Sequence, residues 1–219
     1  MKSTIALPVT LLSALALGSF AETPAPLPTP WQRLLDGNAR FVSDQPNHPH
    51  QDGKRRAEVA SGQKPFAVVI GCADSRTSPE LLFDAGLGDL FVIRLAGNIV
   101  DDAALGSVEF AVAQLGARFI VVLGHEKCGA VSAAVAAVKG AAAPPGHIGV
   151  IVDAIKPAAA SVHGKDGDEV DLAVRANVHA VVDRLKTASP VLRPLLETGE
   201  LGIIGARYDL DDGKVQQVP

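Results

Sequence analysis

Four short apolar runs alternate with helical stretches, and this alternation constrains the fold more than any other feature of the chain. The runs lie at 66–70, 90–93, 119–123 and 201–208, with little polar alternation inside them. Such runs are typical of strands that are covered on both faces. Strands that alternate with helices form parallel sheets through right-handed crossovers. The sequence therefore predicts an α/β fold with a mostly parallel central sheet flanked by helices.

The segments around these runs carry helix and turn signals. Thr29-Pro30 predicts a helix start, because Thr is a favoured N-cap and Pro a favoured first helical residue. Asp212-Gly213 predicts a hairpin, which would add a C-terminal antiparallel edge strand to about four parallel strands. Further helices are expected at 55–60, after Ser78, and at 101–115, 130–138, 148–160, 169–187 and 191–196.

The N-terminus has the features of a signal peptide. Lys2 precedes an apolar stretch at 5–17, and Ser19-Phe20-Ala21 offers small residues at the −3 and −1 positions of a cleavage site. The stretch is short for a transmembrane helix, although an uncleaved anchor is the alternative. We predict a signal peptide at 1–21, a Pro-rich linker at 22–30 and a single domain at 31–219. The protein is then exported, with the periplasm as its expected location and no membrane span after processing.

The charge of the chain argues against one class of partner. The net charge is −4, and positive and negative residues are spread along the sequence. A nucleic-acid-binding domain is expected to carry a basic patch or stripe. We therefore expect no nucleic-acid partner.

Chemically reactive residues follow two of the apolar runs. Cys72-Ala73-Asp74-Ser75-Arg76 comes directly after the first run, and His125 follows the third, with Cys128 three residues later. Parallel sheets bind ligands beyond the carboxyl ends of their strands. If the two runs are neighbouring strands, the only two cysteines meet His125 at one edge, as a donor set known for catalytic zinc. A disulfide is the alternative, but it does not explain His125, Asp74 or Arg76.

These clusters resemble the two zinc motifs of the β-class carbonic anhydrases. CADSR at 72–76 and GHEKCGA at 124–130 carry the resemblance, which also covers 34–41, 88–94, 96–98, 107–111 and 205–209. It implies one zinc ion per chain, held by Cys72, His125 and Cys128. It also implies reversible hydration of carbon dioxide to bicarbonate and a proton by zinc-bound hydroxide.

The resemblance implies roles for further residues. Asp74 would either pair with Arg76, which leaves the fourth zinc position open for water, or bind the zinc itself and close the site. A small substrate pocket forms at a dimer interface in this family, so a homodimer or a dimer of dimers is expected. The residues that match this pocket are Gln63, Phe91, Ala96 and Phe110, the last of which stands where the family often has tyrosine.

One family feature is incomplete in this sequence. Members with a regulatory bicarbonate site carry a tryptophan where this chain has Val69, although Arg94 and Tyr208 match its companions. We therefore expect no regulation of this kind. His48 and His50 lie in a loop without a nearby thiol or carboxylate in the sequence, so we expect them to be solvated rather than to form a second metal site.

Two other functions stay open at this point. A hydrolase of COS or CS2 could use the same scaffold, because one sequence does not show the entrance to the pocket. A non-catalytic protein with a structural zinc ion or a disulfide would need neither Asp74 nor Arg76.

Overall fold

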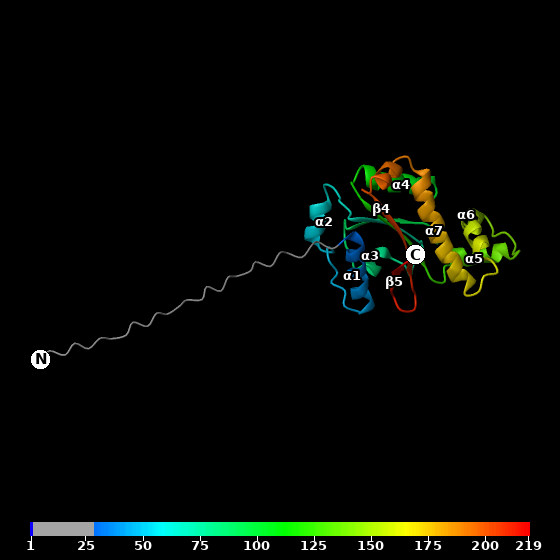
Figure 1. Ribbon diagram of the computed structural model, residues 1–219, viewed down its shortest axis with the longest axis horizontal. Coiled ribbons are helices and arrows are strands. Elements are labelled where there is room, and N and C mark those ends of the chain that lie inside the picture. Colours follow the sequence, from blue (N-terminus) through cyan, green and yellow to red (C-terminus); the bar gives the residue numbers. More distant parts are fainter. Residues whose placement is uncertain (2–28) are drawn as a thin grey trace.

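The central sheet of the protein has five strands in the order β2-β1-β3-β4-β5. In this computed structural model the strands β1 (Ala67–Gly71), β2 (Leu90–Arg94), β3 (Phe119–His125) and β4 (Gly202–Tyr208) are parallel (Figure 1). Strand β5 (Val215–Gln217) pairs with β4 in the antiparallel direction. The predicted fold class, with its C-terminal antiparallel edge strand, is confirmed.

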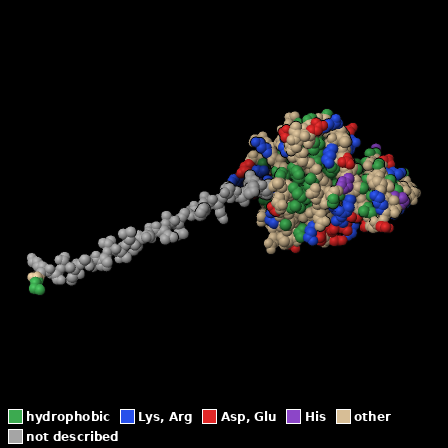
Figure 2. Space-filling model, viewed as in Figure 1, with side chains coloured by type: hydrophobic (Ala, Val, Ile, Leu, Met, Phe, Trp, Pro, Cys, Tyr) green, Lys and Arg blue, Asp and Glu red, His purple; other side chains and the backbone are tan. Residues whose placement is uncertain are grey.

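The structure describes Met1 and residues 29–219. The predicted signal peptide at 1–21 and most of the linker at 22–30 lie outside the described residues, so this division of the chain stays a prediction. Within the part described, no helix is both long enough and apolar enough to cross a membrane. On the face that Figure 2 shows, basic and acidic side chains are interspersed.

The helices begin and end close to where the sequence places them. Thr29 accepts a hydrogen bond from the Gln32 N–H (3.2 Å), which confirms it as the N-cap of the first helix. The helix after Ser78 is only one turn long, because Asp84, just beyond its end, takes a left-handed conformation (φ 42°). The helices are α1 (Pro30–Val42), α2 (Gly53–Val59), α3 (Pro79–Leu82), α4 (Asp102–Ala113), α5 (Gly129–Val138), α6 (Ile148–Val162), α7 (Glu169–Ala188) and α8 (Leu192–Glu197). A short 3-10 turn, η1 (Ala96–Asn98), follows β2 and was not expected from the sequence.

Alternate residues of each buried strand pack on opposite faces of the sheet. Val68 and Ile70 contact the cluster formed by α4, α7 and α8, whereas Ala67 and Val69 contact the cluster that includes α1 and α3. This alternation follows from the two-residue period of a strand. In Figure 1, α4 lies above the sheet and α1 and α3 lie below it. Apolar residues on both faces explain the continuous runs in the sequence.

A third layer extends beyond the carboxyl edge of the sheet. Helices α5 and α6 pack against each other and against the first half of α7, through residues such as Val131, Ile155 and Val174. Cys72 and Cys128 belong to the same buried cluster. Figure 1 shows this layer beside the sheet, away from α1 and α2. The helices therefore cover Cys72 and Cys128 at this edge, whereas Arg76 beside them is exposed.

Missing side chains on the sheet let α7 lie close to β3 and β4. A Cβ atom at Gly124 would lie 2.6 Å from Val178 Cγ2, and one at Gly205 would lie 2.5 Å from Val178 Cγ1. Both distances are below normal van der Waals contact. These two glycines thus determine how closely the middle of α7 approaches the strand ends.

Replacing Gly205 by alanine is expected to destabilise the fold. The added methyl group would overpack the contact with Val178, and overpacking of a filled core costs about 1–3 kcal/mol. The free energy of unfolding in urea measures this loss. Gly106→Ala is the matched control, because a Cβ atom there meets nothing within 4 Å, and alanine is the better helix former inside α4. Equal stabilities for the two variants would contradict the close-packing argument.

Candidate metal centre

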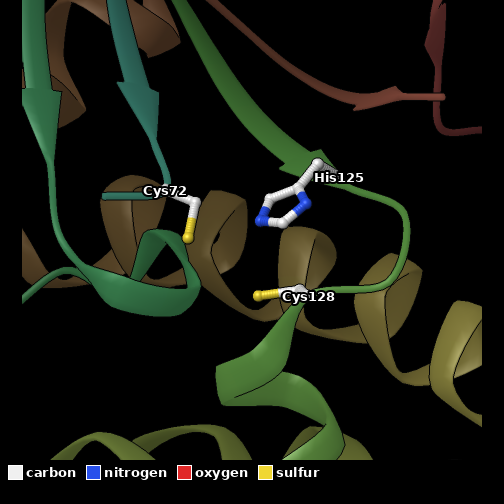
Figure 3. Close-up of side chains that lie close together, drawn as sticks. All are labelled: Cys72, His125 and Cys128. Carbon is white, nitrogen blue, oxygen red and sulfur yellow. The ribbon is translucent and has the colours of Figure 1, made fainter. Parts of the chain in front are cut away.

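Cys72, His125 and Cys128 converge at the carboxyl edge of the sheet. Cys72 follows β1 directly, His125 is the last residue of β3, and Cys128 is the N-cap of α5. Strands β1 and β3 are neighbours, as the convergence requires. The two sulfur atoms and a ring nitrogen all lie within 4.8 Å of one another, and all three residues are buried. Figure 3 shows both thiols and the imidazole directed toward a common point.

The imidazole of His125 is oriented for metal binding. Its Nδ1 lies 2.8 Å from the carbonyl oxygen of Glu126, so Nδ1 carries the proton and Nε2 presents its lone pair. A carbonyl partner on the second ring nitrogen is the usual support of a metal-binding histidine. Nε2 is buried and has no hydrogen-bond partner among the residues that the structure describes. A buried polar atom of this kind is costly unless something binds it, and a metal ion fits.

The two cysteines form no disulfide, and their pKa values are shifted in opposite directions. Hydrogen bonding from the Cys128 thiol, aided by the Asp74 and Gly97 N–H groups, lowers the pKa of Cys72, although burial opposes this. The same contact with Cys72, together with burial, raises the pKa of Cys128. The pair therefore loses its first proton readily and its second with difficulty. A divalent ion would replace that second proton, because the thiolate is the form that binds metals.

Asp74 lies beside these ligands and is held by Arg76. The guanidinium donates two hydrogen bonds to the carboxylate, from Nε to Oδ1 (2.9 Å) and from Nη2 to Oδ2 (2.7 Å). These bonds hold the pKa of Asp74 well below its usual range, so the carboxylate is ionised. Asp74 Oδ2 lies 3.9 Å from His125 Nε2. The structure thus shows the paired arrangement of Asp74 and Arg76, with the carboxylate close to the candidate ligands.

Arg94 supports the loop that carries Cys72 and Asp74. Its Nε donates to the Cys72 carbonyl oxygen (2.8 Å) and its Nη2 to the Asp74 carbonyl oxygen (2.6 Å). The sequence had connected Arg94 only with the family's regulatory site. The signal that would have revealed this contact is the strand register, because Gly71 and Arg94 are partners at the ends of β1 and β2.

The four residues matched to a substrate pocket do not share one element. Gln63 follows α2 and lines a surface hollow with Val59, Leu87 and Gly88, which does not include the other three. Phe91 lies on β2, Ala96 in η1 and Phe110 on α4, where half of its surface is exposed (50%). Within one chain, Gln63 thus lines a hollow that includes none of the other three residues.

The histidines of the loop at 43–52 have structural contacts. His50 Nδ1 lies 2.9 Å from both carboxylate oxygens of Asp89, and the His48 N–H donates to the buried Asp84 (2.9 Å). The expectation that both are simply solvated was thus incomplete, because the ring of His50 is hydrogen-bonded to Asp89. Asp89 also accepts from Arg33 and from the Gly86 N–H, so the group anchors the loop.

A mostly parallel α/β sheet with a buried Cys2His group at its carboxyl edge, and a carboxylate beside that group, is the arrangement of a candidate metal-dependent enzyme centre. Comparison with known proteins gives the particular family. The family model described as carbonic anhydrase matches residues 67–215. Carbonic anhydrase 2 of Mycobacterium tuberculosis is 45% identical over 185 residues, which cover 84% of this chain and 89% of the relative.

Solved structures agree with this family. The β-carbonic anhydrase of Coccomyxa, solved in complex with acetazolamide, matches with a TM-score of 0.67 and 31% identity, over 84% of each chain. A tetrameric β-carbonic anhydrase of Sordaria macrospora shares the fold, with a TM-score of 0.68 at 24% identity over 84% of this chain and 94% of that one. The chain therefore belongs to the β-carbonic anhydrase family. It is an enzyme of the family whose reaction is the hydration of carbon dioxide.

Proposed function

We propose that the protein is a zinc enzyme that interconverts carbon dioxide and bicarbonate, with one zinc ion per chain held by Cys72, His125 and Cys128. The observation that carries this proposal is the buried Nε2 of His125, which has no hydrogen-bond partner in the described part of the chain and is directed at two free thiols. The metal, when bound, lowers the pKa of water so that hydroxide is present near neutral pH to attack carbon dioxide.

Asp74 and Arg76 control access to the fourth position of the site in this proposal. While Arg76 holds both carboxylate oxygens, Asp74 would leave the fourth position open to water. Because Asp74 Oδ2 is only 3.9 Å from His125 Nε2, the same carboxylate would be able to serve as a fourth ligand and close the position. The same carboxylate therefore has two competing partners of positive charge.

The substrate pocket in this proposal is completed by a second copy of the chain. Strand β2 is an edge strand whose residues are all half-buried, and Phe110 on α4 is half exposed. Gln63 lines a hollow that includes neither Phe91 nor Ala96, so the assembly that would bring them together is a homodimer or a dimer of dimers. Sedimentation equilibrium checks this, and a fully active monomer would contradict it.

We also propose that the protein is exported to the periplasm. It is supported by the order of features at 1–21, a positive residue, an apolar stretch and small residues at a cleavage position. N-terminal sequencing of the mature protein checks the cleavage site. A mature protein that begins at Met1 would contradict it.

The rate of hydration is expected to rise on the alkaline side of neutrality. Carbonic anhydrases with three histidine ligands are the known case in which zinc brings the pKa of its water to about 7. Two thiolates offset more of the charge of the metal than neutral imidazoles do, so hydroxide is stabilised less here. Stopped-flow assays between pH 6 and 9, with zinc quantified in the same sample, measure the profile. A flat profile over this range would contradict the argument.

Zinc content, together with the turnover of carbon dioxide and of COS and CS2, separates the alternative functions. A structural zinc protein predicts full zinc occupancy with no hydration activity at any pH. A hydrolase of COS or CS2 predicts turnover of those substrates that exceeds the turnover of carbon dioxide. The Asp74–Arg76 pair beside the ligands favours the catalytic centre, because a structural zinc site is closed by four protein ligands.

A further inference from the structure

Asn177 is a buried amide on a face of α7 that is otherwise apolar. Only 2% of its surface is exposed, and the neighbouring buried positions of the helix include Ala173, Val174, Val178 and Val181. An amide in such a place is costly unless it is hydrogen-bonded. Its Nδ2 donates to the carbonyl oxygen of Gly97 at 2.8 Å, across 80 residues of sequence. The helix therefore reaches the turn η1 through one polar contact.

Gly97 is held at both of its backbone groups. Its carbonyl accepts from Asn177, and its N–H donates to the sulfur of Cys72 at 3.2 Å. Its conformation is left-handed (φ 68°), which favours glycine, and a Cβ atom there would lie 2.4 Å from Ile155 Cδ1. The turn is thus tight and unusual, and the Asn177 amide is the side-chain group that holds its carbonyl in place.

The N–H of Gly97 acts on a sulfur that the proposed function assigns to the metal. Groups that donate hydrogen bonds to ligand atoms orient those atoms and adjust how much charge they give to the metal. The N–H of Asp74 also donates to this sulfur, at 3.4 Å, but it comes from the same loop as Cys72. The Gly97 N–H is the backbone donor that ties the Cys72 sulfur to a different part of the fold.

We infer that Asn177 is a positioning residue of the metal centre, which acts through Gly97 on the thiolate of Cys72. This inference rests on the proposed function, because it takes Cys72 to be a metal ligand. Val178 packs closely against Gly124 and Gly205. This packing fixes the distance of α7 from the sheet, so that the neighbouring Asn177 reaches η1. The helix layer thereby contributes to the electronic environment of a ligand that it does not itself supply.

The test replaces Asn177 by leucine, which has the same branched shape, with bulkier methyl groups, and no donor. Zinc affinity, measured by competition with a chelator, is expected to fall about 10- to 100-fold, the usual effect of losing a group that supports a ligand. In the cobalt-substituted protein, the thiolate-to-cobalt charge-transfer band is expected to shift. Asn177→Ser is the second variant if the leucine variant does not fold, since its hydroxyl is too short to reach the Gly97 carbonyl.

Asn38→Leu is the matched control. Asn38 is equally buried (4% exposed) and makes three hydrogen bonds, to the Leu82 and Gly213 carbonyls and from the Val215 N–H. It lies on α1, on the other face of the sheet, so its loss should lower thermal stability and leave zinc affinity and the cobalt spectrum unchanged.

Three results would overturn the inference, and they are distinguishable. Wild-type affinity and spectrum in the folded Asn177 variants would show that the amide has only a packing role. An equal change in Asn38→Leu would show that any loss of core polar contacts weakens the centre. A wild-type chain that binds neither zinc nor cobalt would overturn the proposed function itself, and the inference with it.

Discussion

Cys128→Ser is expected to abolish zinc binding and to lower carbon dioxide hydration by at least ~10³-fold. A serine hydroxyl keeps its proton at neutral pH and is a poor ligand, so one of three protein ligands is lost. A metal ion contributes several kcal/mol of transition-state stabilisation, and each 1.36 kcal/mol is a factor of ten in rate. Zinc content by elemental analysis and the hydration rate are measured on the same preparation.

The fold of this variant is expected to survive. Cys128 is 1% exposed at the start of α5, and serine nearly matches cysteine in size. Ser132→Ala is the control from the same helix, because it removes only a hydrogen bond from the Ser132 hydroxyl to the Cys128 carbonyl (3.0 Å). One zinc ion per chain and normal hydration in Cys128→Ser would contradict the assignment of this thiol as a ligand.

The strands and the meeting of the thiols with the imidazole could be predicted because both follow from local patterns. Apolar residues on both faces of β1 and β3 leave a recognisable run in the sequence, and parallel strands bring their carboxyl ends to one edge. His125 was expected just beyond its strand. It lies instead within β3, because β4 continues the pairing up to the partners His125 and Tyr208.

The supporting contacts could not be predicted, because they join distant positions without a repeated pattern. Asn177 stands out in the sequence only as one amide among the apolar residues of a helix, and nothing local connects it with Gly97, 80 residues earlier. The clamp of Arg94 on the Cys72 and Asp74 carbonyls depends on the register of β1 against β2, which apolar content alone does not define. The candidate ligands were thus visible in the sequence, whereas the groups that hold them in place were not.

Arg76→Ala is expected to lower the hydration rate strongly, because Asp74 and Arg76 have different roles at the site. Without the guanidinium, Asp74 loses both of its charge-assisted side-chain bonds and has the metal as its remaining positive partner. The carboxylate is expected to occupy the fourth position, so hydration should fall about 10- to 100-fold. Arg76→Lys is the matched variant and should lose less, because it keeps the charge but not the two-pronged geometry.

Between pH 6 and 9, protonation of Asp74 does not account for the lower hydration rate expected in Arg76→Ala. The pairing with Arg76 holds the pKa of Asp74 below its ordinary acidic value, and even that ordinary value lies far below pH 6. Asp74 is therefore ionised from pH 6 to 9 in both proteins, so a lower rate does not arise from protonation of the carboxylate. Cobalt spectra of the variant should show a fourth protein ligand in place of water. If Asp74 and Arg76 form only an exposed ion pair with no catalytic role, the rate and the spectrum of the variant should be unchanged, because such pairs contribute little to stability. That result would remove Arg76 from the mechanism. It would leave Cys72, His125 and Cys128, the proposed ligands, as the whole of the centre.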